Sequence, residues 1–151
     1  MSIRFYYLLG VAWLFISACG KPQVLDINQS VKDTSWLYNQ SVKAEFEVTD
    51  SLKAYQLLFK FRNTQDYPYE NLYVIMRLKG PGLNKQLRYK FQIADSKGAW
   101  LGKGSGDRFQ LLLPLYPEFK FPKKGKYSLE IEHNMDTNPL SGVSDIGLNI
   151  N

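Results

Sequence analysis

Apolar and polar side chains alternate along most of the chain after Trp36. In the segment 127–132, for example, a tyrosine, a leucine and an isoleucine are separated by a serine and two glutamates. A period of two residues is typical of a β-strand with one buried and one solvated face. The same pattern predicts further strands around residues 45–48, 55–62, 72–79, 87–93 and 146–150. No stretch has the spacing of an amphipathic helix.

The segments between these strands are rich in glycine, proline, asparagine, aspartate and serine, which favour turns. They cover residues 49–51, 63–68, 80–82, 95–98, 122–125 and 138–139. Roughly seven or eight short strands joined in this way predict an all-β domain, an antiparallel β-sandwich of immunoglobulin-like or jelly-roll type. The pattern does not separate these two topologies. The glycine-rich segment 98–107 lacks strand character, and we expect it to be a loop.

The beginning of the chain follows a different pattern. An apolar run at residues 5–16 follows Arg4 and leads into Ile16-Ser17-Ala18-Cys19. The run is too short for a membrane-spanning helix and is typical of a secretory signal peptide. The last four residues form a lipobox, so we expect cleavage before Cys19 and acylation of that cysteine. An ordinary signal peptide that ends in a chance cysteine is the alternative.

These patterns divide the chain into three parts. We expect a lipoprotein signal peptide at 1–18, a lipid anchor and tether at 19–35, and the β-sandwich domain at 36–151. The polar residues of the tether segment would also suit a loosely docked first strand. The mature chain of 133 residues is long enough for one domain with its own core.

Composition excludes several classes of function. The formal net charge of the whole chain is +5, and its lysines and arginines form no long block, so a nucleic-acid role has little support. Attraction to an anionic lipid or glycan surface stays open. Cys19 is the only cysteine and His133 the only histidine, so we expect no disulfide, no metal and no cofactor.

No motif in the chain predicts catalysis. Without a serine in a nucleophile-elbow context, His133 is interpreted as a histidine at a strand end. The pairs Glu45/Glu47 and Glu130/Glu132 alternate with apolar residues, which favours a solvated sheet face. The segment 102–106 matches no phosphate-binding glycine motif. We therefore expect a protein that is not an enzyme.

Aromatic side chains are the candidates for an interaction site. The segment 67–73 reads Tyr-Pro-Tyr-Glu-Asn-Leu-Tyr, and aromatic residues are favoured in both protein interfaces and carbohydrate sites. Tyr67, Tyr69 and Tyr73 are candidates for exposed recognition, with ordinary packing as the alternative. Trp100 is a further candidate, and for this residue we favour a place in the core.

Four features in this order give the chain a resemblance to the gliding-motility lipoprotein H family (GldH) of the Bacteroidetes. They are the lipobox at Cys19, the segment 63–73, the loop 98–104, and the run from 125 through Met135 to 148. The resemblance extends from Cys19 to the C-terminus. One departure is Asp136, which stands where the family more often has a basic residue.

The resemblance implies a non-enzymatic envelope component needed for gliding motility, a process linked to type IX secretion. It implies an outer-membrane anchor with the domain facing the periplasm, and other gliding or secretion proteins as partners. The alternative is a glycan-binding lipoprotein of a polysaccharide uptake system, with Tyr67, Tyr69 and Trp100 as stacking platforms. Asp50-Ser51-Leu52 also resembles the O-glycosylation acceptor of exported proteins in this phylum, which makes Ser51 a candidate acceptor.

Overall fold

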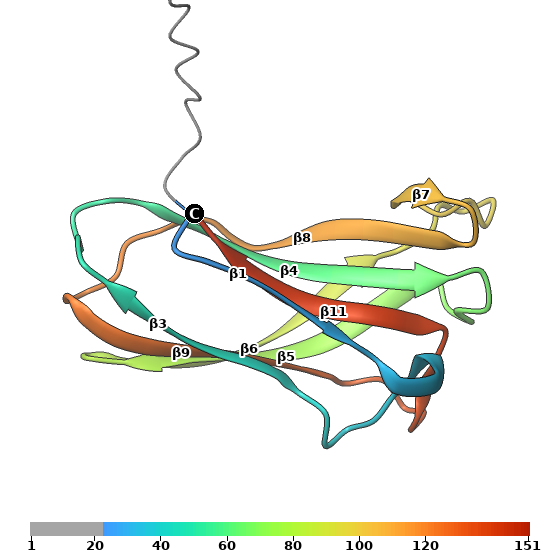
Figure 1. Cartoon of the computed structure of the whole chain (residues 1–151), viewed down its shortest axis with the longest axis horizontal. Helices are drawn as coiled ribbons and strands as arrows, with labels where there is room; N and C mark the ends of the chain where they lie inside the picture. The colour runs from blue at the N-terminus through green and yellow to red at the C-terminus, as the bar shows by residue number, and fades with distance from the viewer. Residues whose placement is uncertain (1–22) are drawn as a thin grey trace, which may run out of the picture.

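The computed structural model describes residues 23–151, so the signal peptide and Cys19 lie outside the described residues. Two antiparallel sheets face each other as a β-sandwich, which confirms the predicted fold class (Figure 1). The first sheet has the order β1 (Leu25–Ser30), β11 (Val143–Ile150), β4 (Tyr55–Thr64), β8 (Arg108–Phe119) and β7 (Lys103–Ser105). The second has the order β3 (Val42–Val48), β9 (Gly125–His133), β5 (Asn71–Gly80) and β6 (Leu83–Gln92). A 3-10 turn, η1 (Lys32–Thr34), precedes the short pair β2 (Ser35–Trp36) and β10 (Leu140–Ser141).

The core lies between the two sheets and is filled by the apolar side of the alternating pattern. In β3, every second side chain is buried and the intervening lysine and glutamates are exposed. β5 and β9 repeat this alternation, and their intervening residues, which apart from Ile75 are mostly polar, are partly or fully exposed. Burying one large apolar side chain contributes about 1.5–3 kcal/mol, so the shared faces of these strands supply most of the stability. The largest fully buried side chains include Trp36, Phe59, Phe61, Tyr127 and Ile131.

β8 and β7 are strands that the sequence pattern did not predict. Pro114 and Pro117 lie within β8, and a proline has no backbone N–H to donate to a neighbouring strand. β8 pairs with β4 on one side, but on the other side only its first residues pair with β7. Past β7, no other strand of the described chain pairs with this edge, so the prolines stand where few donors are needed. The expected loop at 98–107 therefore contains a short strand, Lys103–Ser105.

β1 corrects the expected boundary between tether and domain. It pairs with β11 along its whole length, from Leu25 opposite Ile150 to Ser30 opposite Asp145. The backbone is already bonded at Val24, whose amide donates to the carbonyl of Ile150 at 2.8 Å. The assignment of all of 19–35 to a tether is thus wrong, because residues 25–30 form a strand that is paired along its whole length. The other expectation for this segment, a docked first strand, holds. The folded domain begins by Val24 and not at Trp36.

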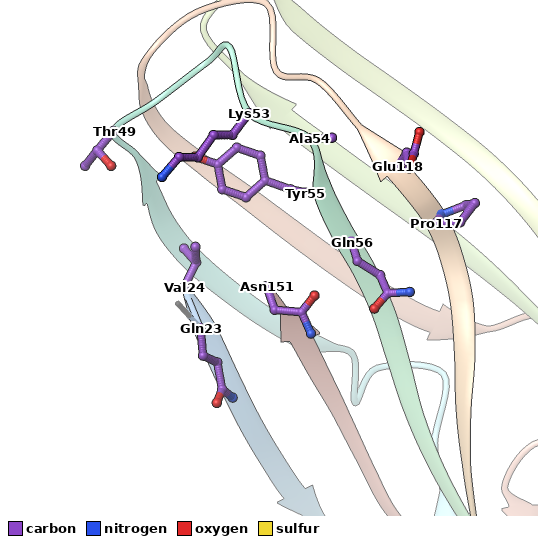
Figure 2. A pocket seen from close by; sticks show the side chains of 10 residues that line it. All are labelled: Gln23, Val24, Thr49, Lys53, Ala54, Tyr55, Gln56, Pro117, Glu118 and Asn151. Atoms are coloured by element: carbon purple, nitrogen blue, oxygen red, sulfur yellow. The ribbon is translucent and has the colours of Figure 1, made fainter. Parts of the chain in front are cut away.

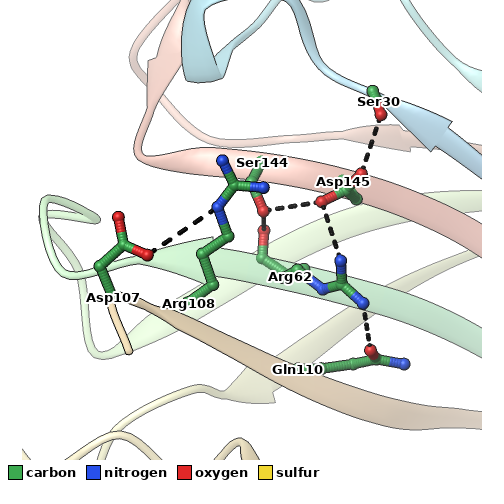
Figure 3. Close-up of polar contacts among 7 residues, drawn as sticks. All are labelled: Ser30, Arg62, Asp107, Arg108, Gln110, Ser144 and Asp145. Carbon is green, nitrogen blue, oxygen red and sulfur yellow. Dashed lines mark hydrogen bonds and ion pairs between the residues drawn. The ribbon is translucent and has the colours of Figure 1, made fainter. Parts of the chain in front are cut away.

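Polar side chains on the outer face of the first sheet link its strands (Figure 3). Arg62 on β4 donates to the Gln110 side chain on β8 at 2.6 Å and pairs with Asp145 on β11 at 3.4 Å. Asp145 accepts a further hydrogen bond from Ser30 on β1 at 3.0 Å. This row of contacts crosses four strands and holds the N-terminal strand at the sheet edge.

His133 ends β9 and is almost completely buried, which fits the interpretation of a histidine at a strand end. Its ring lies 4.6 Å from the stacked ring of Tyr38 and 5.0 Å from Trp36, measured between centroids. Within the described residues, neither ring nitrogen has a side-chain or backbone hydrogen-bond partner. Burial lowers the pKa of His133, because a charged imidazolium would lose its hydration there.

We expect the free energy of unfolding to fall as the pH drops below about 6.5. Near that pH the unfolded histidine takes up a proton, whereas the buried ring takes it up only at lower pH. The contribution of the neutral ring is therefore complete above the unfolded pKa and is lost as the pH falls toward the folded pKa. The slope is at most about 1.4 kcal/mol per pH unit, and urea unfolding between about pH 8 and pH 5 measures it.

His133→Phe is the control for this slope, because it keeps an aromatic ring and removes the titrating group. Asp26 and Glu132 act in a different pH range. Their pKa values are lowered by hydrogen bonds from Lys60 and Arg77, so their contribution is present above about pH 4.5 and is lost only below it. An unchanged slope between about pH 6.5 and pH 5 in His133→Phe would contradict the assignment to His133.

Candidate functional site

Tyr67 does not have the exposed position that an interaction residue needs. It is 3% exposed, and its ring meets those of Phe61 and Trp100 edge-on at 5.5 and 6.2 Å. Its hydroxyl donates to the carbonyl of Asn71 at 3.0 Å, and burial raises its pKa. The interpretation of Tyr67 as a recognition or stacking residue is therefore wrong, and the alternative of ordinary packing holds.

Trp100 lies between the two expectations for it. It is half-buried, with its ring 6.2 Å from Tyr67 and 6.0 Å from Phe109. Its backbone forms an isolated bridge with Ala94. Trp100 therefore covers one end of the core from the outside, and part of its ring stays exposed.

Tyr69 and Tyr73, by contrast, line a common groove of about 450 Å³. It lies where the β4–β5 connection, β5, β6 and the segment after β9 meet. Tyr69 and Tyr73 are half-buried against the core, and the exposed part of each ring faces the groove. Its lining consists of Pro68, Tyr69, Glu70, Asn71, Tyr73, Arg88, Asn134, Met135 and Asp136.

Arg88 and Tyr73 form the best-defined part of this groove. The guanidinium carbon of Arg88 lies 4.3 Å from the centroid of the Tyr73 ring, a cation–π contact. The Nε of Arg88 donates to the side-chain oxygen of Asn134 at 2.7 Å, which fixes the guanidinium over the ring. Sequence reasoning missed Arg88 and Asn134, because on an alternating strand an arginine looks like any other solvated residue.

The far wall of the groove is held by contacts to the segment after β9. The backbone amide of Tyr73 approaches the sulfur of Met135 at 3.2 Å. The Tyr38 hydroxyl donates to the carbonyl of Met135, and the hydroxyls of Tyr69 and Thr137 lie 3.1 Å apart. The groove is thus preformed, with aromatic walls, the Arg88 guanidinium, and the carboxylates of Glu70 and Asp136 at its margin. A second cation, Lys90, lies with its Nζ 5.8 Å from the centroid of the Tyr73 ring. Such a surface can bind a peptide segment or a sugar.

A second hollow, of about 460 Å³, lies at the opposite end of the sandwich (Figure 2). It is lined by Gln23, Val24, Thr49, Lys53, Ala54, Tyr55, Gln56, Pro117, Glu118 and Asn151. Tyr55 supports one side, where its hydroxyl donates to the carbonyl of Asp50 at 2.8 Å. Ser51 lies in the same connection and is partly exposed, and its O-glycosylation stays a prediction.

Two further observations concern residues 23–151 alone. Among them, no three His, Cys, Asp or Glu side chains are grouped so that they could hold a metal ion. No helix in this part of the chain is long and apolar enough to cross a membrane.

Comparison with known proteins relates the whole folded domain to one family. Residues 23–150 match the family described as GldH lipoprotein. The gliding motility lipoprotein GldH homolog of Christiangramia forsetii is 32% identical over 145 residues, which cover 91% of this chain and 88% of that protein. The gliding motility lipoprotein GldH of Flavobacterium johnsoniae is 29% identical over 158 residues, covering 99% and 98% of the two chains.

Proposed function

Because the chain belongs to the GldH lipoprotein family, we propose that it is a membrane-anchored component of a gliding motility machinery. Its part is structural and not enzymatic: it holds another envelope protein in place through the groove at Tyr73. Cys19 carries the acyl chains that fix it to the membrane. The protein sits in the outer membrane, faces the periplasm and acts alongside type IX secretion.

The preformed groove is the observation that carries the structural role. Its tyrosines come from the segment 63–73 and its far wall from the region of Met135, which hold two of the four features on which the resemblance to the family rests. Aromatic residues and arginine are the side chains most often responsible for binding energy in protein interfaces. A guanidinium already held over a ring loses little conformational entropy when a partner binds.

A glycan-binding lipoprotein is the second candidate function. Tyr69 and Tyr73 still offer partly exposed aromatic rings beside polar groups, as a sugar site requires. The case is weaker than it was from sequence, because Tyr67, one of the three expected stacking residues, is buried. Gene neighbours discriminate the two: motility lipoproteins favour the first function, and sugar importers with hydrolases favour the second.

Replacing Tyr69 and Tyr73 together by alanine is expected to impair gliding with only a small loss of stability. Both residues are only half-buried, whereas truncation of an interface anchor typically costs about 2 kcal/mol or more of binding, roughly a thirtyfold loss of affinity. Colony spreading of the native host measures gliding. Crosslinking in the same cells, followed by mass spectrometry, measures capture of the partner.

Tyr116→Ala is the matched control, because Tyr116 is also half-buried but lies on β8, outside the groove. We expect this variant to glide and crosslink normally. Binding of envelope polysaccharide should be the same for all three proteins. A double variant that glides normally but has lost polysaccharide binding would overturn the structural role and favour the glycan receptor.

A further inference from the structure

The chain emerges from the sandwich at one particular end. Gln23 and Val24 line the hollow there together with Asn151, Lys53 and Glu118 (Figure 2). The β3–β4 connection (49–54) and the β8–β9 connection (120–124) lie at this same end, as Figure 1 shows. We call it the anchor end.

The length of chain before Gln23 keeps the anchor end close to the membrane. Cys19 precedes Gln23 by four residues, which span at most about 14 Å when fully extended. A ten-residue strand such as β4 carries the opposite end of the sandwich about 33 Å further away. This step rests on the acylation of Cys19 proposed above.

The side chains of the anchor end suit an anionic bilayer. Leu52 is 86% exposed, although it is a large apolar residue, and it stands near the middle of the β3–β4 connection. The two connections carry four exposed lysines against one acid, Asp50, and Glu118 lies nearby at the end of β8. The lysines are Lys53, Lys120, Lys123 and Lys124.

The opposite end lacks this excess of positive charge. Its connections, at 31–34, 65–70, 93–102, 106–107 and 134–139, carry six acids against two lysines, and the exposed bases Lys103 and Arg108 stand beside them in β7 and β8. The acids are Asp33, Asp66, Glu70, Asp95, Asp107 and Asp136. An anionic surface therefore attracts the anchor end more strongly than the other, so charge and tether length favour the same orientation.

We propose that the anchor end is a second membrane contact, in which Leu52 enters the headgroup region and the four lysines face anionic lipid phosphates. The contact holds the sandwich so that its long axis points away from the bilayer surface. It leaves the Tyr73 groove, which opens near the opposite end, free for a partner. Each lysine near such a surface raises the ratio of docked to undocked protein by roughly fivefold.

The test uses the full acylated protein in vesicles and measures how deep Leu52 lies. Leu52→Cys provides one labelling site for an environment-sensitive fluorophore, because the natural Cys19 is blocked by acylation. Leu101→Cys is the matched control, since Leu101 is also exposed, at 52%, but belongs to the opposite end. In vesicles that contain phosphatidylglycerol and nitroxide-labelled lipid, we expect strong quenching at position 52 and little at 101.

Charge variants then test the lysines. The double variant Lys123→Ala, Lys124→Ala is expected to lower the ratio of docked to undocked protein by roughly 25-fold. About 0.5 M salt should do the same. Lys32→Ala with Lys97→Ala, which alters the opposite end, should leave quenching unchanged. Equal quenching at positions 52 and 101, or no effect of the first pair, would overturn the contact.

Two further outcomes are distinguishable in the same samples. Flotation of the vesicles reports the anchor, so protein that floats without quenching at position 52 refutes the contact and leaves the anchor standing. Protein that does not float refutes the anchor, and the contact with it. A glycan on Ser51, detected by intact mass of the native protein, would also refute the contact, because a sugar beside Leu52 holds the connection off the bilayer.

Discussion

Replacing Cys19 by alanine is expected to move the protein from the membrane fraction to the soluble fraction. In the proposed function, the acyl chains on Cys19 are the strong attachment. Two or three chains hold a protein stably, at about 0.8 kcal/mol for each buried CH₂ group, whereas lysines and one leucine at a surface hold it weakly. Labelling with a fatty-acid analogue and fractionation of the native host measure the change.

The fractionation should include a wash at high salt, because salt screens the lysines but does not affect acyl chains. The wild-type protein is expected to stay with the membranes after the wash, and Cys19→Ala is expected to leave them. Fatty-acid label on the Cys19→Ala protein would contradict the assignment of Cys19 as the acylated residue of a lipoprotein.

Trp36→Ala is expected to destabilise the domain by about 3–5 kcal/mol. Trp36 has no exposed surface, its Nε1 donates to the carbonyl of Gln40 at 2.6 Å, and its ring packs against Phe59 and His133. Alanine would leave a large cavity between the sheets and an unpaired carbonyl at Gln40. Urea unfolding at neutral pH measures the loss, which is a large part of the stability of a domain this size.

Trp100→Ala is the matched comparison, and we expect a clearly smaller loss, because only part of that indole is buried. Far-ultraviolet circular dichroism checks that both variants keep the β-sheet spectrum. Equal losses for the two tryptophans would contradict the burial that separates them.

The sequence pattern predicted the strands that have one buried and one solvated face. β3, β5 and β9 alternate almost without exception, and each was expected near its observed position. The pattern failed at β1 and β8, although it predicted the edge strands β3 and β6. β1 reads Leu-Asp-Ile-Asn-Gln-Ser and buries little, whereas β8 contains two prolines. In both strands, pairing with a distant partner overrides a weak local preference.

The site was predicted in part for a similar reason. Residue type identified Tyr69 and Tyr73 as candidates. It could not tell that Tyr67, in the same segment, is buried. The ring of Tyr67 is buried against Phe61 and Trp100, and its backbone lies so close to Gly142 that a Cβ at Gly142 would be 2.4 Å from the Tyr67 Cα. Gly142 also has a φ of +76°, which favours glycine. This contact joins residues far apart in sequence and leaves no local signal.

The pairing of β1 with β11 determines when the domain can finish folding. The first strand of the sandwich completes its hydrogen bonds only with the last, and β11 also separates β1 from β4. A chain that enters the envelope with its N-terminus leading must therefore wait for its final residues before the first sheet closes. Contacts between such distant segments slow folding, and during the delay β1 and β4 expose edges that can pair with other chains. An anchor that acts early holds this unfinished sheet at the membrane, where the concentration of competing chains decides whether it folds or aggregates.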